Sequence, residues 1–452
     1  MASSDKISKF SADRIVTVEI PTATIPSRTQ VVLGQTSETS GLEEFRGIPY
    51  GLVKARWEHS LVRDSLPSDV FDARRNGPRC PQPAEPNNTA TFQAHLDFPT
   101  DVQESEFDCL NLFVVRPNPA LVRDAPLPVY FYIHGGGYGF GAGTDPMWNP
   151  TALVAQSLII GKPIVAVNIN YRLNIFGFGC SNDIVTAQDP SNPIRGGNFG
   201  LGDQRRALEW VVKNIGCFGG DNTRITIGGQ SAGGSSTHAH VLDARLNSKG
   251  AGPLFRRAII QSGAVGTLGP ISLPKANANF SLLRSQYPDL NITALKKMSV
   301  GELIEKTKQL GWWVFPLVDD GITIKPAKVG RWHVSLGHGD AVLDGNPRTG
   351  TRDPLRVMLG DTDVEASIWH ENVRDVNDYT HLEALMRPNV TEDIWTQLAK
   401  LYHFDANTPL PQLHEGLTQL LTDIEFGNPV YLATRELLST NALDQTDDQT
   451  SA

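Results

Sequence analysis

The segment Gly229-Gln-Ser-Ala-Gly233 places a serine between two glycines, each two positions away from it. It follows an apolar run at residues 224–227 and precedes small residues that can begin a helix. This is the strand, turn and helix context of a G-x-S-x-G nucleophile elbow. The two glycines are needed because side chains next to the serine would collide with neighbouring backbone in so tight a turn. The motif predicts that Ser231 exposes its hydroxyl as a nucleophile.

A second motif, Ile133-His-Gly-Gly-Gly137, also follows an apolar run. Acyl transfer develops negative charge on the carbonyl oxygen, and a run of glycines lets several backbone N–H groups converge on that oxygen. The predicted donors are Gly136, Gly137 and Ala232, the residue after the serine. The alternative interpretation of the glycine run is a flexible turn between a strand and a helix.

The elements that would position these motifs follow from the hydrophobic pattern. Runs that are apolar on both faces predict buried parallel strands. A helical pattern begins at Asp203, its expected cap, and has Ala207, Val211 and Ile215 on one face. The alternation predicts an α/β fold with a central, mostly parallel sheet, with both motifs at the carboxyl ends of strands. The expected strands are residues 128–133, 164–169, 224–227, 258–260 and 355–359.

The flanking segments predict additions to this core. Residues 16–20 and 31–33 are expected to form an antiparallel hairpin at the edge of the sheet. Residues 279–405 have a mostly helical pattern. Residues 441–452 are polar and acidic and predict a disordered tail, so residues 1–440 are expected to form a single domain.

Composition excludes several classes of partner. The 40 Lys and Arg against 49 Asp and Glu give a net charge of −9 without a dense basic run, which argues against nucleic acid. No stretch of 18 apolar residues predicts a membrane span, and residues 1–12 lack the apolar core of a secretion signal, so we expect a cytoplasmic rather than a secreted protein. The spacing of the four cysteines matches no zinc pattern, and neither a metal nor a cofactor is expected.

The chain resembles the type-B carboxylesterase/lipase family, the cholinesterase-like branch of the α/β-hydrolases. The resemblance implies a serine ester hydrolase that acts on small-molecule esters through a Ser–Glu–His triad and a glycine-built oxyanion hole. It rests, beyond the elbow, on a set of motifs in family order: Phe45-Arg-Gly-Ile-Pro-Tyr50, Gly77-Pro-Arg-Cys80, Asp108-Cys-Leu110, Ile133-His-Gly-Gly-Gly137, Asn170-Tyr-Arg172, Gly200-Leu-Gly-Asp-Gln204, Phe218-Gly-Gly-Asp221 and Gln261-Ser-Gly263.

The resemblance also assigns residues outside the two motifs. Glu365, at the end of the Gly-x-x-x-x-Glu pattern at residues 360–365, matches the family's catalytic acid, although the neighbouring aspartates leave a solvated acidic loop as the alternative. Cys80 and Cys109 match a disulfide that closes a loop, with a pair of buried free thiols as the alternative. Arg172 and Asp203 resemble a buried structural ion pair.

The pattern departs from the family at the histidine, which follows the acid in α/β-hydrolases. None of His370, His381, His403 and His414 occupies the family's position, and we expect each to be a surface or hydrogen-bonded histidine. The family's last strands and histidine loop are expected to be missing, through a shortened gene product, completion by a partner, or an interrupted gene. Two hypotheses follow: an ester hydrolase whose base is not found in this chain, and a catalytically impaired or inactive carboxylesterase-like binding protein.

Overall fold

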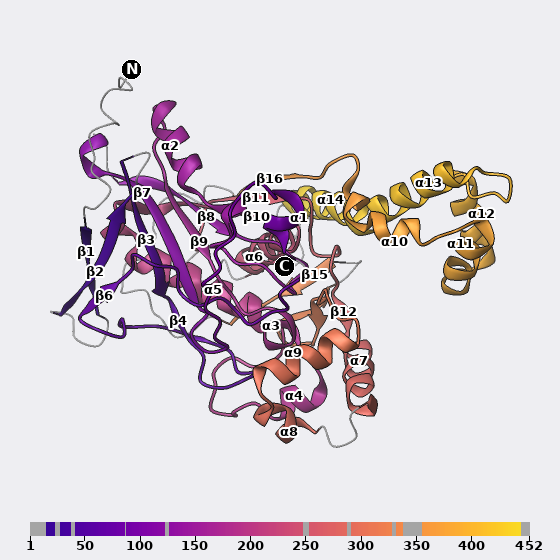
Figure 1. Cartoon of the computed structure of the whole chain (residues 1–452), viewed down its shortest axis with the longest axis horizontal. Helices are drawn as coiled ribbons and strands as arrows, with labels where there is room; N and C mark the ends of the chain where they lie inside the picture. Colours follow the sequence, from indigo (N-terminus) through magenta and orange to yellow (C-terminus); the bar gives the residue numbers. More distant parts are fainter. Residues whose placement is uncertain are drawn as a thin grey trace, which may run out of the picture.

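A twisted central sheet organises the computed structural model of this chain (Figure 1). The structure describes residues 15–22, 28–37, 41–85, 87–122, 126–246, 253–286, 291–327, 331–337 and 355–443. Within them the sheet has ten strands, nine of which follow one another in hydrogen-bonded order while β6 (Val70–Asp72) pairs beside β2. That order is β1 (Ile15–Pro21), β2 (Thr29–Thr36), β3 (Leu42–Pro49), β7 (Asn111–Pro117), β9 (Val165–Ile169), β8 (Leu127–Ile133), β10 (Gly220–Gln230), β11 (Arg257–Gln261) and β16 (Arg356–Gly360).

The sheet has an antiparallel part and a parallel part. Strands β9, β8, β10, β11 and β16 are parallel to one another, and they include all five strands predicted from apolar runs. Strands β1 and β2 form the predicted antiparallel hairpin, in the register Val18 to Val32. Strands β3 and β7 join this hairpin to β9 through antiparallel pairing. The predicted α/β class with a central, mostly parallel sheet is therefore confirmed.

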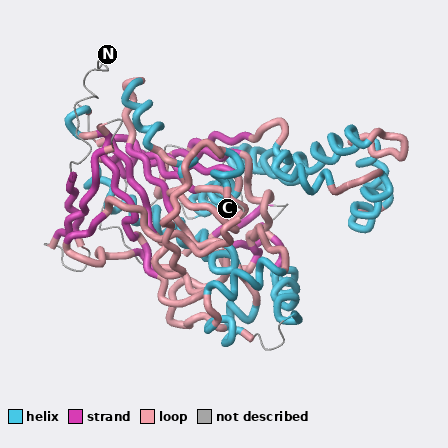
Figure 2. Tube along the Cα trace, viewed as in Figure 1, coloured by secondary structure: helices cyan, strands magenta, loops and turns pink. Residues whose placement is uncertain are grey.

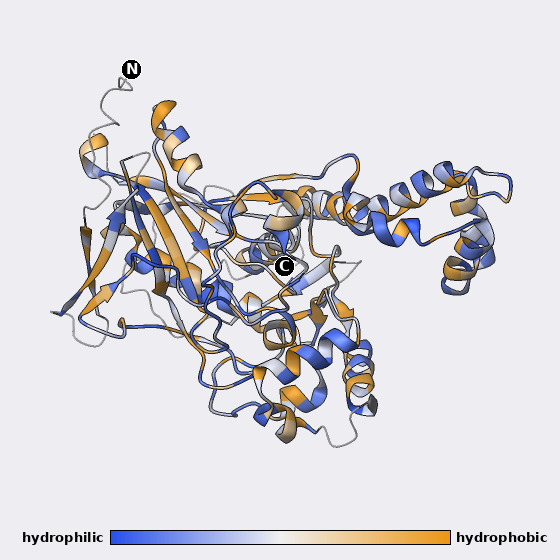
Figure 3. Cartoon of the chain, in the orientation of Figure 1, coloured by the Kyte–Doolittle hydropathy of each residue, from blue (hydrophilic) through white to orange (hydrophobic). Residues whose placement is uncertain are grey.

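Helices cover both faces of the sheet, which explains the runs that are apolar on both sides. Along β7, Leu112 and Val114 belong to the main core, whereas Phe113 and Val115 pack beneath α2 (Thr151–Ile159) on the opposite face. Helices α5 (Phe199–Asn214) and α6 (Ala232–Leu246) fill the main-core side. Figure 3 shows the resulting hydrophobic colouring along the central strands. Shorter helices α3 (Asn174–Phe178) and α4 (Asn182–Thr186) precede α5.

The expected cap of the long helix was wrong. The helix α5 begins at Phe199, with Asn198 in the left-handed region at a φ of 52° as its N-cap residue. The side-chain amide of Asn198 donates to the Val318 carbonyl and the Thr323 hydroxyl, and these bonds hold the residue in the left-handed conformation. Asp203 lies inside the helix and is fully buried, where its carboxylate serves an ion pair instead of a helix terminus.

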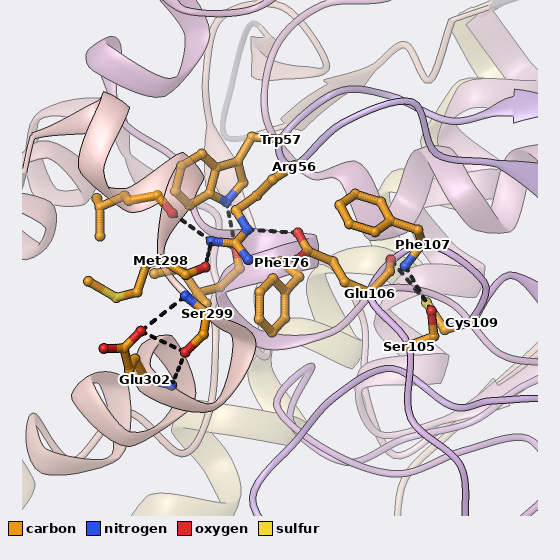
Figure 4. Close-up of polar contacts among 12 residues, drawn as sticks. Arg56, Trp57, Ser105, Glu106, Phe107, Cys109, Phe176, Met298, Ser299 and Glu302 are labelled. Atoms are coloured by element: carbon orange, nitrogen blue, oxygen red, sulfur yellow. Dashed lines mark hydrogen bonds and ion pairs between the residues drawn. The ribbon is translucent and has the colours of Figure 1, made fainter.

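A helical excursion is anchored to the core by a buried ion pair, which Figure 4 shows in close-up. The guanidinium of Arg56 binds the Glu106 carboxylate at 2.7 Å and donates to the Leu295 and Met298 carbonyls. These carbonyls lie at the end of α8, so the pair ties the excursion to the loop that carries Glu106. The excursion comprises α7 (Leu273–Gln286), α8 (Ile292–Lys297) and α9 (Val300–Gln309). In the described ranges three two-stranded pairings also accompany the core: β4 (Gly51–Leu52) with β5 (Leu61–Val62), β12 (Ile271–Ser272) with β13 (Val318–Asp319), and β14 (Ile324–Ala327) with β15 (Arg331–Val334).

The C-terminal helices project from the body as an arm, seen in cyan at the right of Figure 2. Its outer part has its own apolar cluster around Trp395, Phe404 and Leu413. The chain then returns through α14, where Val430 and Ala433 pack on Leu359 of β16. The helix continues to Leu443, so the predicted tail does not begin at residue 441, and residues 444–452 lie outside the described part. The arm consists of α10 (His370–Arg374), α11 (Tyr379–Met386), α12 (Glu392–Leu401), α13 (Leu410–Thr422) and α14 (Asn428–Leu443).

No helix in the described ranges combines the length and the apolar character that crossing a membrane requires.

Candidate active site

Ser231 lies in the tight turn between β10 and α6, with its backbone at a φ of 59°. A Cβ on Gly229 would collide with the Gly233 carbonyl, and a Cβ on Gly233 would collide with the Ile133 carbonyl. The Ser231 amide donates to the Gln261 carbonyl at 2.9 Å, which fixes the turn against β11. Within the described residues, the Ser231 hydroxyl has no hydrogen-bond partner. The sequence folds so tightly here because both flanking positions lack side chains.

The glycine run packs directly against this turn. A Cβ on Gly135 would stand 3.2 Å from the Ser231 Cβ, so only glycine leaves this approach open. Gly136 and Gly137 have φ values of 115° and 58°, and in the described part of the chain neither amide donates to any acceptor. Ala232 is the first residue of α6, where amides have no partner within the helix. Three backbone donors thus remain available beside the Ser231 side chain.

A cavity of about 510 Å³ opens above these residues. Ser231, Gly136, Gly137 and Glu365 all line it, so the structure brings the candidate nucleophile, two candidate donors and the candidate acid to one space. Most of the remaining wall is apolar. Its aromatic members are Phe92 of α1 (Asn88–Phe92), Phe140, Trp148, Trp313, Trp369 and Phe426.

Glu365 begins the 3₁₀ turn Glu365–Trp369, which follows the end of β16 at Gly360 after a short loop. Its Oε1 atom accepts a hydrogen bond from the Thr362 amide at 2.7 Å. The turn is attached to the end of α13, because the Ala366 amide donates to the Thr422 hydroxyl at 3.1 Å. These two hydrogen bonds fix the position of the turn that carries Glu365.

Glu425 is a cavity residue that the sequence analysis missed. Its Oε2 atom accepts a hydrogen bond from the Trp369 indole at 2.9 Å, and burial raises the pKa of the carboxyl, against the lowering effect of that bond. The sequence offers only a carboxylate between Asp423 and Phe426 as a signal, and nothing in the local pattern indicates its contact with the cavity.

No histidine lines the cavity among the described residues. His370 is exposed and pairs with Glu371, and the His414 ring contacts the Val376 carbonyl at 2.7 Å. His381 lies in the first turn of α11, and His403 lies in the loop after α12. The structure therefore does not bring any of these four side chains to Ser231.

His134 supports the glycine run from behind. Its Nδ1 atom lies 2.8 Å from the Gly135 carbonyl oxygen, and its ring stacks on Tyr171 with centroids 4.5 Å apart. Burial lowers the pKa of His134 to about 4, so the ring is neutral at physiological pH. This side chain positions the loop without facing the cavity.

The disulfide that the resemblance implied is not formed. Cys80 and Cys109 are both buried free thiols, which was the alternative interpretation. A hydrogen bond between the two thiols, together with burial, raises the pKa of Cys109. Each sulfur has a further partner, since Cys80 accepts from the Leu173 amide and Cys109 contacts the Glu106 carbonyl. The pair is satisfied without a covalent bond.

Arg172 and Asp203 form a bidentate ion pair in the core, with both N–O distances at 2.8 Å. The Ser60 hydroxyl donates to the same carboxylate, and Arg172 also donates to the Glu58 carbonyl. Neither side chain lines the cavity. In the ranges that the structure covers, no cluster of His, Cys, Asp and Glu is arranged to hold a metal ion.

Comparison with known proteins agrees with this geometry. The chain is 31% identical to Lipase 3 of Yarrowia lipolytica over 67% of its own length and 35% identical to Lipase 1 of the same yeast over 80%. It spans only 58% and 67% of those two relatives. It is also 30% identical, over 61% of its length and 46% of the relative, to a protein from Byssochlamys spectabilis named Inactive carboxylesterase-like protein VdtD.

Solved structures give the same relationship. A PNB esterase structure aligns with 92% of this chain and 76% of its own, at a TM-score of 0.65 and 26% identity. The sequence profile described as the Carboxylesterase family matches residues 21–443, which is nearly the whole described chain. With the elbow, the glycine run and the sheet order in place, the chain belongs to the carboxylesterase family.

Proposed function

We propose that this chain is a carboxylic ester hydrolase in which Ser231 is the nucleophile. The observation that carries the proposal is the shared cavity, which is lined by Ser231, two glycines with free amides and Glu365. A serine presented at a tight turn beside unpaired backbone donors is the arrangement that acyl transfer requires.

The reaction follows from these positions. Attack by the Ser231 oxygen forms a bond to the carbonyl carbon and moves an electron pair onto the carbonyl oxygen. The amides of Gly136, Gly137 and Ala232 stabilise that oxygen. Collapse of the intermediate breaks the bond to the alcohol oxygen, which takes up the proton that Ser231 gave up, and leaves an acyl group on Ser231. Water then attacks this acyl group, releases the carboxylic acid and returns a proton to the Ser231 oxygen.

The base in this proposal is not one of the described cavity residues. Glu365 corresponds to the acid of a catalytic triad. In such a triad the acid holds the histidine in the correct tautomer. Because none of the described histidines lines the cavity, the Ser231 proton has no efficient acceptor in the described site. Loss of a triad member lowers turnover on the order of 10⁴ to 10⁶-fold while the oxyanion donors retain some rate.

A second candidate is a carboxylesterase-like binding protein without catalysis. The absence of a histidine among the described cavity residues favours it, and so does the similarity to a relative that is itself named inactive. The cavity and its free amides would still bind acyl-like ligands in that case.

The test compares hydrolysis of para-nitrophenyl butyrate by the wild type, Ser231→Ala and Ser367→Ala. Ser367 is the matched control, because among the residues that the structure describes its exposed hydroxyl bonds only to the Val364 carbonyl, and it does not line the cavity. Slow hydrolysis that S231A abolishes and S367A retains supports the enzyme. Equal rates in all three, with butyrate-ester binding preserved, would support the binding protein.

A further inference from the structure

The arm contributes to the cavity through one irregular helical turn. Residues Asp423–Gly427 form a π-helical segment between α13 and α14. Such wide turns inside helices recur at functional sites, because they redirect side chains that a regular helix would place elsewhere. Here the segment directs Glu425 and Phe426 to the cavity wall, on which Ser231 also lies.

Glu425 brings a negative charge that has no counterion among the described residues. One carboxylate oxygen accepts from the Trp369 indole at 2.9 Å, while the other has no partner within the described residues. The only other charged side chain on the described wall is Glu365, and no Lys or Arg lines it. The carboxyl is partly buried, and its raised pKa reflects the cost of keeping that charge out of water.

The rest of the wall suits a positive charge. Three tryptophans and three phenylalanines surround the space, and the faces of aromatic rings attract cations. Trp369 has two roles here: its indole N–H donates to Glu425, and its side chain lines the same cavity. An anionic group would instead meet two carboxylates with no compensating cation.

We propose that Glu425 makes this cavity select esters that carry a positively charged nitrogen, through the free carboxylate oxygen and the surrounding rings. A bound ammonium group supplies the counterion that the described wall lacks and donates to the free oxygen. A hydroxyl group would satisfy the oxygen without neutralising the charge, and is the weaker match. The inference rests on the proposed function for its kinetic test, and on binding alone for its second test.

The kinetic test uses pairs of esters that have nearly the same shape. Dimethylaminoethyl butyrate is compared with isopentyl butyrate, in which a carbon replaces the charged nitrogen on the alcohol side. The ethyl esters of dimethylaminobutyric and methylhexanoic acids place the same difference on the acyl side. We expect at least one cationic ester to have a kcat/KM about tenfold above that of its neutral partner at pH 7, as for a hydrogen bond to a charged group.

The variants separate charge from shape. Glu425→Gln keeps an acceptor for the Trp369 indole but removes the charge, and should abolish the preference. Glu425→Asp keeps the charge and should retain part of it. The matched control is Glu415→Gln, which makes the same change in net charge on the exposed side of α13. A preference that survives E425Q, or one lost equally in E415Q, overturns the inference.

The binding test does not need catalysis. Calorimetric titration with benzyldimethylamine, which is cationic at pH 7, is compared with titration with benzyl methyl ether. We expect the amine to bind the wild type about tenfold more tightly than the ether, and E425Q to bind the two alike. Equal binding by the wild type overturns the inference even if Ser231-dependent hydrolysis is present. Selective binding without hydrolysis would sustain it and count against the proposed enzyme.

Discussion

A methyl group of Val314 lies 2.5 Å from the position that a Cβ on Gly137 would occupy. The two residues are also joined through the backbone, because the Phe315 amide donates to the Gly137 carbonyl at 2.9 Å. The strap after α9 thus closes over the glycine run and holds its amides in the cavity wall. This contact, together with a φ of 58°, explains why position 137 tolerates no side chain.

Gly137→Ala should therefore impair the site more than the fold. The new methyl group would displace the Val314 strap or the Gly137 amide, and loss of one oxyanion donor lowers kcat about 10² to 10³-fold. Steady-state kinetics on an aryl ester measures this. The control is Gly301→Ala in α9, where nothing lies within 4 Å and Ala favours the helix, so kcat should be unchanged. Equal kcat in both variants would contradict a role for the Gly137 amide.

Asp203→Asn should destabilise the whole protein without changing the chemistry. The substitution leaves the Arg172 guanidinium buried without its charge partner, which costs about 3–5 kcal/mol of the free energy of unfolding. Urea unfolding measures that loss. Glu392→Gln, which breaks an exposed pair with Arg387, should leave the urea midpoint almost unchanged. An unfolding midpoint equal to that of the wild type would show that the Arg172 pair contributes little.

Local motifs explain which parts of the site could be predicted. Ser231 and the glycine run follow from short patterns whose backbone demands are contained in a few neighbouring residues. Glu425 could not be predicted in the same way, because it reaches the cavity through a π-helical segment and a bond to Trp369, 56 positions away in sequence. The elements of the fold also differ in whether a local pattern predicts them.

The parallel strands show as runs that are apolar on both faces, whereas the antiparallel β3 was missed because it contains Glu43, Glu44 and Arg46. Pairing with Arg116 and Arg46 neutralises those glutamates within the sheet. Asp203 was expected to be a helix cap because aspartate favours that position. The helix instead contains Asp203 as the partner of Arg172, a pairing that the family resemblance implied but that no local pattern reveals.

Glu106→Gln should loosen the helical excursion that carries the cavity strap. Arg56 would keep its bonds to the Leu295 and Met298 carbonyls but lose the carboxylate 2.7 Å away (Figure 4). We expect faster amide hydrogen exchange in α8 and α9 and a higher KM for aryl esters, since Val314 follows these helices. Glu104→Gln, at the more exposed pair with Arg79, is the control. Unchanged exchange in α8 would show that the excursion does not depend on the Arg56 pair.

His238→Asn should make the protein less sensitive to acid. The ring of His238 is fully buried in α6, its Nδ1 atom accepts from the Val265 amide at 3.1 Å, and burial lowers its pKa from 6.5 to about 4. Below pH 6.5 the ring takes up a proton in the unfolded chain but stays neutral in the folded protein, so the wild type loses stability as the pH falls from 6.5 to 4. At pH 5 this one ring accounts for about 2 kcal/mol of that loss.

Asn at position 238 can keep the acceptor for the Val265 amide but cannot be protonated. Urea unfolding at pH 7 and pH 5 should therefore show a smaller loss in H238N than in the wild type, whereas the exposed His370→Asn should behave as the wild type does. Equal losses in H238N and the wild type would mean that the buried ring takes up its proton without unfolding.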